Sequence, residues 1–221
     1  MPTQGVYSSR VHRVARWISD LANPLFVPPI VFIVIGVLNN ISTAELGWLT
    51  LLSLCFYTFI PLVTALALLK SGHIESLDIP RRESRNLLYL LGIASAAVGS
   101  LALGIFFYPH RPFLTLISGI FCINPVIGYL LNRRWKVSIH SASISSGGII
   151  LLFFYLWELG ITQSTAIVFS LILLLIILPV MMWSRFYLEV HTMPELIGGA
   201  TAGIFFTTVE ILLTFYFWQP L

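Results

Sequence analysis

The feature that most constrains the fold of this chain is a succession of long apolar runs separated by short polar stretches. A helix that crosses a bilayer needs about 20 mostly apolar residues. Seven runs approach this length, at 24–39, 47–69, 87–107, 113–132, 139–158, 162–183 and 196–218. Because backbone N–H and C=O groups must be bonded internally in hydrocarbon, such runs fold as helices. We predict an all-α, polytopic transmembrane helix bundle with six or seven spans, since the proline-rich first run is either a span or a broken helix.

The overall composition leads to the same class of protein. Hydrophobic residues make up 57% of the 221 residues and charged residues only 10%, whereas a soluble domain carries roughly 25% charged residues. We therefore expect an integral, multi-pass membrane protein, and we place it in the cell inner membrane. The net charge of +3 is small. We expect the basic groups to meet membrane lipids, with no nucleic-acid partner.

The N-terminal segment, residues 1–23, differs from residues 24–221, which we predict to form a single transmembrane domain. Three arginines interrupt the segment and no apolar stretch with a small-residue cleavage site follows directly, so the pattern is not typical of a signal peptide. Apolar residues recur in it at helical spacing, at Val11, Val14, Ile18 and Leu21. We predict an amphipathic helix over about 8–22 that lies on the membrane surface; a disordered polar tail is the alternative.

The basic residues are distributed unevenly between the two sides that seven spans would create. One side receives the N-terminus and the connections 70–86, 133–138 and 184–195, which together hold eleven of the twelve lysines and arginines. The other side receives Arg111 alone. By the positive-inside rule the first side is cytoplasmic. The residues with candidate chemistry, described next, all lie on this side.

The stretch 184–195, S-R-F-Y-L-E-V-H-T-M-P-E, places Arg185, His191 and Glu195 within twelve residues where a predicted span ends. A histidine beside a phosphate-binding arginine and an orienting acid is suited to attack on a phosphoryl group. Glu195 also fits a capping box that starts at Thr192, three residues before it. Because His191 and Glu195 are four residues apart, Glu195 can serve both roles.

Two further clusters are predicted on the same side. Arg82 and Arg85 are three residues apart before the third span and would share one side of a helical turn, which suits a phosphate clamp. Ser138 and His140 stand where the fifth span begins, where free backbone N–H groups favour an anion. The alternatives are a solvated loop for the arginines, an ordinary N-cap for Ser138 and an interfacial location for His140.

Small residues predict which helices approach each other closely. The start of the fifth span is nearly free of bulky side chains over 141–148, and Gly199 and Gly203 form a G-x-x-x-G pattern in the last span. Small residues allow membrane helices to pack at short distances. We therefore expect the helices that begin at His140 and at Glu195 to lie side by side, which would bring the second and third clusters together.

The pattern S-R-x5-H-x3-E at 184–195, preceded by S-x-H at 138–140 and by an arginine-rich loop, resembles the motifs of the type 2 phosphatidic acid phosphatase superfamily. The resemblance covers roughly residues 70–200, and the 184–195 motif is its most specific part. The sequence departs from the family pattern at three places. The second motif reads V-S-I-H without the usual proline and glycine, Glu195 replaces an aspartate, and the first motif is a weak match.

The resemblance implies a mechanism through a phosphohistidine. His191 would attack phosphorus, His140 would protonate the leaving oxygen and then activate water, and Glu195 would fix the tautomer of His191. The phosphate would be bound by Arg82, Arg85, Ser138 and Arg185. Because these arginines can supply the positive charge that phosphoryl transfer requires, we expect neither a metal nor another cofactor.

The membrane setting predicts a substrate whose phosphate lies at the interface while its chain stays in hydrocarbon, such as a lipid monophosphate or an isoprenoid diphosphate. Two alternatives from other classes remain open. The bundle could be a transporter or a lipid-binding protein whose basic side docks anionic headgroups. It could also be a metal-dependent hydrolase in which His191 and Glu195 are ligands.

Overall fold

The computed structural model describes residues 9–74, 85–108, 111–158 and 164–217. Within these ranges the chain is helical and contains no strand. Six helical stretches are long and apolar enough to cross a membrane, and a seventh, Ile139–Phe153, is apolar but shorter. The prediction of an all-α bundle with six or seven spans is therefore confirmed, and the chain has the helices of a multi-pass membrane protein.

The predicted spans correspond to continuous helical stretches, three of which contain short changes of helix type. The elements are α1 (Ser9–Leu21), η1 (Pro24–Phe26), α2 (Val27–Leu38), α3 (Thr43–Ser53), η2 (Leu54–Phe59), α4 (Ile60–Lys70), α5 (Arg85–Phe107), α6 (Pro112–Asn132), α7 (Ile139–Glu158), α8 (Ser164–Ile172), η3 (Leu173–Ile177), α9 (Leu178–Tyr187) and α10 (Met193–Phe217). The π-helical turns η2 and η3 end just before Pro61 and Pro179. Proline cannot donate the regular helical hydrogen bond, which accounts for the change of register at these points.

The predicted first run, 24–39, begins with a short 3-10 turn and continues directly as α2, so it is not broken between residues 24 and 38. The chain leaves the helical conformation just before this run, at Asn23. The η1 turn at Pro24–Phe26 separates α1 from α2, and the Asn23 side chain caps it by accepting a hydrogen bond from the Leu25 N–H at 3.0 Å. Helix α1 itself covers almost the whole range predicted for an amphipathic helix, which makes a disordered tail wrong for residues 9–21. It packs against α9 and buries Ala15 and Ser19, and its location on the membrane surface stays a prediction.

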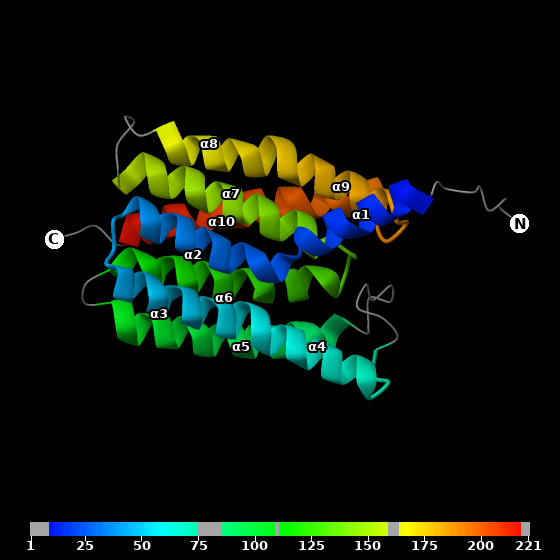
Figure 1. The fold of residues 1–221 in the computed structure, drawn as a ribbon, viewed down its shortest axis with the longest axis horizontal. Coiled ribbons are helices and arrows are strands. Elements are labelled where there is room, and N and C mark those ends of the chain that lie inside the picture. The colour runs from blue at the N-terminus through cyan, green and yellow to red at the C-terminus, as the bar shows by residue number, and fades with distance from the viewer. Residues whose placement is uncertain (1–8, 75–84, 109–110, 159–163, 218–221) are drawn as a thin grey trace, which may run out of the picture.

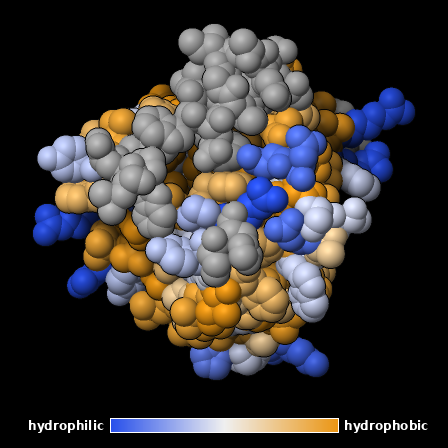
Figure 2. Space-filling view, turned by 90° about the vertical axis from the view of Figure 1, so that its left-hand side faces the viewer, coloured by the Kyte–Doolittle hydropathy of each residue, from blue (hydrophilic) through white to orange (hydrophobic). Residues whose placement is uncertain are grey.

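The connections divide between the two ends of the bundle, as Figure 1 shows. The N-terminus, the end of α4, the connection from α6 to α7 and the turn from α9 to α10 lie at one end. The opposite end carries the α2–α3 connection and the C-terminus. Figure 2 looks onto this opposite end, where hydrophilic residues form a small central group among hydrophobic ones. One ion pair found there joins Arg111 Nε to Glu45 Oε1 at 3.5 Å.

Helices α7 and α10 pack in direct backbone contact, which confirms their predicted close approach. A Cβ atom added at Gly199 would overlap the backbone of Ser138, and one at Gly203 would overlap the carbonyl of Ala142 and the side chain of Ser145. Only glycine can occupy these two positions without moving the helices apart. The start of α7 and the first turns of α10 are therefore fixed relative to each other.

Candidate functional site

The end of α9 turns the chain so that His191 returns toward Arg185. The Val190 N–H donates to the Arg185 carbonyl at 3.1 Å, and the Glu189 N–H donates to the Phe186 carbonyl at 3.0 Å. Together with the positive φ of Glu189, 55°, these two bonds form a Schellman motif. The His191 N–H also points to the Arg185 carbonyl, at 3.4 Å. The turn thus explains how a spacing of six residues brings the arginine and the histidine to one place.

His191, just before α10, and Glu195, in the first turn of α10, form a close pair. His191 Nδ1 lies 2.7 Å from Glu195 Oε2, and the imidazole is buried, with 5% of the residue exposed. The same carboxylate oxygen accepts from the Thr192 N–H at 3.3 Å, which is one half of the predicted capping box. Glu195 therefore caps the helix and orients the histidine at the same time. An ionised carboxylate at this position favours the tautomer with a proton on Nδ1, which leaves the lone pair on Nε2.

The connection between α6 and α7 is tied to this pair from the other side. Lys136 Nζ donates to the Val190 carbonyl at 3.0 Å and lies 3.5 Å from Glu195 Oε2. The Ser138 N–H donates to the Glu195 carbonyl at 3.0 Å. Sequence reasoning did not assign Lys136 a role, and its only signal was its position two residues before the S-x-H pattern. Its ammonium group stabilises the carboxylate and holds the two connections together.

Arg185 is buried and held by the N-terminal helix. Only 3% of this residue is exposed, and its Nη1 donates to Ser19 Oγ of α1 at 2.8 Å. A hydrogen bond from a charged donor is among the stronger ones in a protein. Helix α1 therefore contributes directly to the position of the arginine, although nothing in the local sequence of α1 indicated this.

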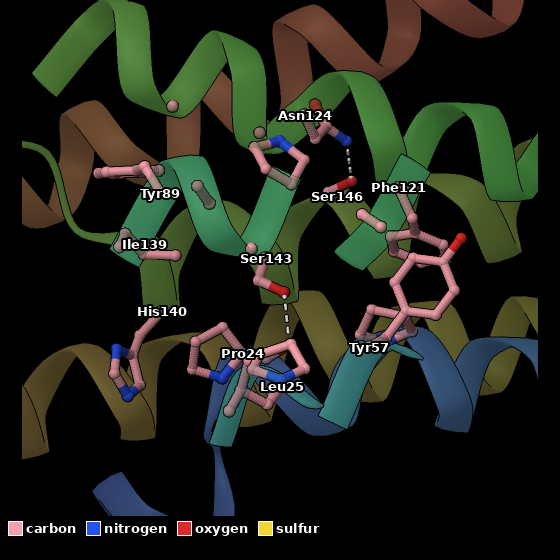
Figure 3. A pocket seen from close by; sticks show the side chains of 18 of the residues that line it. Pro24, Leu25, Tyr57, Tyr89, Phe121, Asn124, Ile139, His140, Ser143 and Ser146 are labelled. Atoms are coloured by element: carbon pink, nitrogen blue, oxygen red, sulfur yellow. Dashed lines mark hydrogen bonds between the residues drawn. The ribbon is translucent and has the colours of Figure 1, made fainter. Parts of the chain in front are cut away.

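Three of the predicted residues line one cavity of about 340 Å³, namely His140, His191 and Arg185. The rest of the lining is mainly apolar and comes from η1, α2, α4, α5, α6, α7 and α10, with Tyr57 of η2 among it. Figure 3 shows His140 at one end of this cavity and Tyr57 and Phe121 at the other. The cavity thus joins two imidazoles and a guanidinium to a long apolar space.

The remaining predicted site residues stand apart from this cavity or outside the described ranges. Ser138 is fully buried, and its Oγ accepts from the Ser141 N–H at 3.4 Å, as an N-cap of α7 does. Its position supports the capping alternative more than phosphate binding. Arg82 lies outside the described residues. Arg85 is the first residue of α5, one turn before Tyr89, which lines the cavity.

A metal site was one of the alternatives for the histidine and the acid. In the parts of the chain that the structure describes, no group of three or more His, Cys, Asp or Glu side chains is placed to hold a metal ion. Glu195 instead interacts with Lys136, Thr192 and His191. The expected independence from metals stays a prediction.

In comparisons with known proteins, no family model, curated protein or solved structure matches this chain. The resemblance to the phosphatase superfamily therefore depends on the motif residues at 138–140 and 184–195. To these the structure adds that His140, Arg185 and His191 line one cavity.

Proposed function

We propose that this protein is a membrane phosphatase that hydrolyses a lipid monophosphate or a prenyl or lipid diphosphate through a phosphohistidine intermediate. One observation carries the proposal. His140, His191 and Arg185 line the same cavity, and most of the remaining lining is apolar. A phosphate held at the polar end would leave the hydrocarbon part of its lipid in surroundings that match it.

In the proposed first step, His191 Nε2 attacks phosphorus in line with the leaving lipid oxygen. The P–N bond forms, the P–O bond to the lipid breaks, and His140 gives a proton to the departing alkoxide or phosphate. In the second step His140 takes a proton from water, the water oxygen attacks phosphorus, and the P–N bond breaks. Inorganic phosphate leaves and His191 is regenerated.

The surroundings of His191 support its role as nucleophile. Glu195 engages Nδ1, so the nitrogen that would attack is Nε2. As phosphorus is transferred, the ring acquires positive charge, and the carboxylate 2.7 Å away stabilises that charge. Arg185 supplies positive charge for the phosphate oxygens, and we include Arg82 and Arg85 as further candidates for this task.

The location of the site supports a substrate taken from the membrane. The motif residues lie at the end of the bundle where the described connections carry most of the basic residues (Figure 1). We propose that this end faces the cytoplasm and that the protein resides in the cell inner membrane, as the charge distribution favours. The phosphates of membrane lipids lie at this level of a bilayer. The substrate phosphate could therefore reach the site while the hydrocarbon chain stays in the membrane interior.

The test measures phosphate release from a panel of lipid phosphates by the purified full-length protein in lipid nanodiscs. His191→Ala should lower kcat/KM by about 10⁴-fold because it removes the nucleophile. His140→Ala should lower it by about 10²- to 10⁴-fold because it removes the general acid and base. A radiolabelled phosphate should remain on the wild-type protein after rapid quenching, stable to base and labile to acid, and should be absent from His191→Ala.

His73→Ala is the matched control, because His73 bonds to Ser71 at 2.8 Å in an exposed turn and does not line the cavity. It should keep wild-type activity. Chelation with EDTA should also leave the activity intact. Activity that strictly requires added magnesium, or bound zinc that His191→Ala releases, would favour the metal-dependent alternative. Headgroup binding without any phosphate release would favour a lipid-binding protein.

A further inference from the structure

The cavity extends well beyond the groups that would handle a phosphate. Its lining on α6 runs from Leu131 to Phe121, ten residues along the helix, or about 15 Å at the helical rise. The hydrocarbon core of a bilayer is about 30 Å thick. The cavity therefore reaches from the histidines to about the middle of the bundle, where Tyr57 and Phe121 line its far end (Figure 3).

The walls of the deep part are suited to hydrocarbon. On α5 the lining residues are Leu88, Tyr89, Gly92 and Ala96, which form one face of the helix. Asn124 is the main polar residue there, and its amide nitrogen is engaged by Ser146 at 2.9 Å and by Thr207 at 3.1 Å. The polar groups in this region are thus bonded to one another, and the cavity presents mostly carbon to an occupant.

The glycine at the middle of this wall borders open space. A Cβ atom added at Gly92 would meet no other atom within 4 Å, although the residue lies in the middle of a helix and lines the cavity. Packed protein interiors rarely leave voids much larger than a water molecule. An apolar space of this length, with buried cationic and imidazole groups at one end, is complementary to an anionic amphiphile.

We propose that this cavity binds the single hydrocarbon chain of a one-chain lipid phosphate, an isoprenoid phosphate or a lysophospholipid-type phosphate, with its phosphate at His191. The volume, about 340 Å³, lies near the lower limit for ligand pockets, and helices enclose the deep part on several sides. It suits one chain and not the two chains of a diacyl lipid. This assignment rests on the proposed function for the position of the phosphate.

The first test changes the depth of the cavity. Gly92→Leu places a side chain in the open space about midway along the part of α5 that lines the cavity. It should lower kcat/KM for geranylgeranyl phosphate by about 10- to 100-fold and leave dimethylallyl phosphate, whose five-carbon unit is much shorter than the cavity, almost unaffected. Single-chain lysophosphatidates of increasing length should follow the same order. Gly119→Leu is the control, because a Cβ atom added at Gly119 also meets nothing within 4 Å but Gly119 does not line the cavity. This variant should leave kcat/KM unchanged for both the long and the short substrate.

The second test needs no variant and no turnover. A non-hydrolysable farnesyl phosphonate that carries a diazirine at its tail is bound to the wild-type protein in nanodiscs and photolysed, and the labelled peptides are identified by mass spectrometry. Labelling should fall on the deep lining, around Ala96 and Phe121. Labelling confined to the lipid-facing exterior would overturn the assignment, as would equal effects of Gly92→Leu on all chain lengths or a preference for diacyl phosphatidate that Gly92→Leu does not change.

The two tests separate the chain site from the proposed activity. Deep labelling without phosphate release from any lipid phosphate would leave the chain site standing and end the phosphatase proposal. Phosphate release that depends on His191, together with labelling outside the deep lining, would support the phosphatase proposal and end the proposal of a chain site. If Gly92→Leu does not fold, Gly92→Ala and the labelling of the wild-type protein still decide the matter.

Discussion

Two neighbouring helix pairs in this bundle are packed in different ways. Helices α7 and α10 touch through their backbones, because Gly199 and Gly203 leave no room for a Cβ atom. Helices α5 and α6 also pack along each other, but a Cβ atom added at their glycines would meet side chains or open space and not backbone. At Gly104 an added Cβ would make an ordinary contact with Thr115 at 3.5 Å, and at Gly92 it would meet nothing. Both pairs contain glycines. In α10 the glycines allow backbone contact with a neighbouring helix, whereas Gly92 in α5 borders open space.

The difference matches what each pair contributes to the site. The α7–α10 pair carries His140 at the start of one helix, with His191 just before the other, and contact without a gap fixes their relative positions. The α5–α6 pair forms a wall of the cavity, and Gly92 in this wall borders open space. Catalytic groups need fixed geometry, whereas a chain site needs volume. Backbone contact at the glycines of one pair and open space beside a glycine of the other thus serve different parts of one proposed site.

The largest expected effect comes from placing the same methyl group in each pair. Gly199→Ala forces a Cβ against the backbone of Ser138, and backbone cannot yield as a side chain does. We expect a loss of about 3 kcal/mol of stability and a matching loss of phosphatase activity. Gly128→Ala in α6 brings its Cβ to 3.1 Å from the ring of Tyr89, which can shift. Its cost should be offset by a gain of about 1 kcal/mol in helix propensity.

Thermal unfolding in nanodiscs, with phosphate release measured in parallel, compares these two variants. If both lower the melting temperature equally, the two pairs do not differ in packing and the contrast drawn above is wrong.

A smaller effect is expected from the contact that depends on the α7–α10 register. Lys136→Met removes the bond to the Val190 carbonyl and the ion pair with Glu195. His191 should then be held less firmly, because the turn before it and its partner Glu195 each lose a contact. We expect kcat of the proposed reaction to fall by about 10- to 100-fold with little change in KM. Lys136→Arg should restore part of the activity because it keeps the charge.

Arg111→Met is the control for Lys136→Met. It breaks a partly exposed ion pair with Glu45 at the opposite end of the bundle, which is worth at most about 1 kcal/mol. It should leave kcat unchanged. Equal losses in both variants would indicate a general effect of lost charge and not a positioning role for Lys136.

The smallest expected effect concerns the polar link between the two pairs. Asn124 of α6 donates to Ser146 of α7 and to Thr207 of α10. Such bonds between membrane helices are worth about 0.6 kcal/mol on average. In a double-mutant cycle of Asn124→Leu and Thr207→Val, we expect a coupling energy of this size. A coupling above about 2 kcal/mol would mean that the two pairs form one rigid unit, contrary to the comparison above.

Much of the fold could be predicted from the sequence, because hydropathy and helical spacing are local properties. The seven apolar runs and the close approach at Gly199 and Gly203 were visible in the residues themselves, whereas the sequence left open whether the proline-rich first run is a span or a broken helix. The pairing of His191 with Glu195 followed from their spacing of four residues. The roles of Lys136 and Ser19 could not be predicted in this way, because their partners are distant in the sequence. Lys136 is 54 residues from Val190, and Ser19 is 166 residues from Arg185.

The sequence by itself determined that this chain forms apolar helices and that His140, His191 and most of its basic residues gather at one end. These properties follow from the length and composition of each segment, because hydrocarbon tolerates only internally bonded backbone. Only the tertiary structure decided which residues surround the cavity, that Ser138 caps α7 beside it, and that α1 holds Arg185. Those outcomes depend on how several helices pack against one another, and the volume left between them is not a property of any single segment.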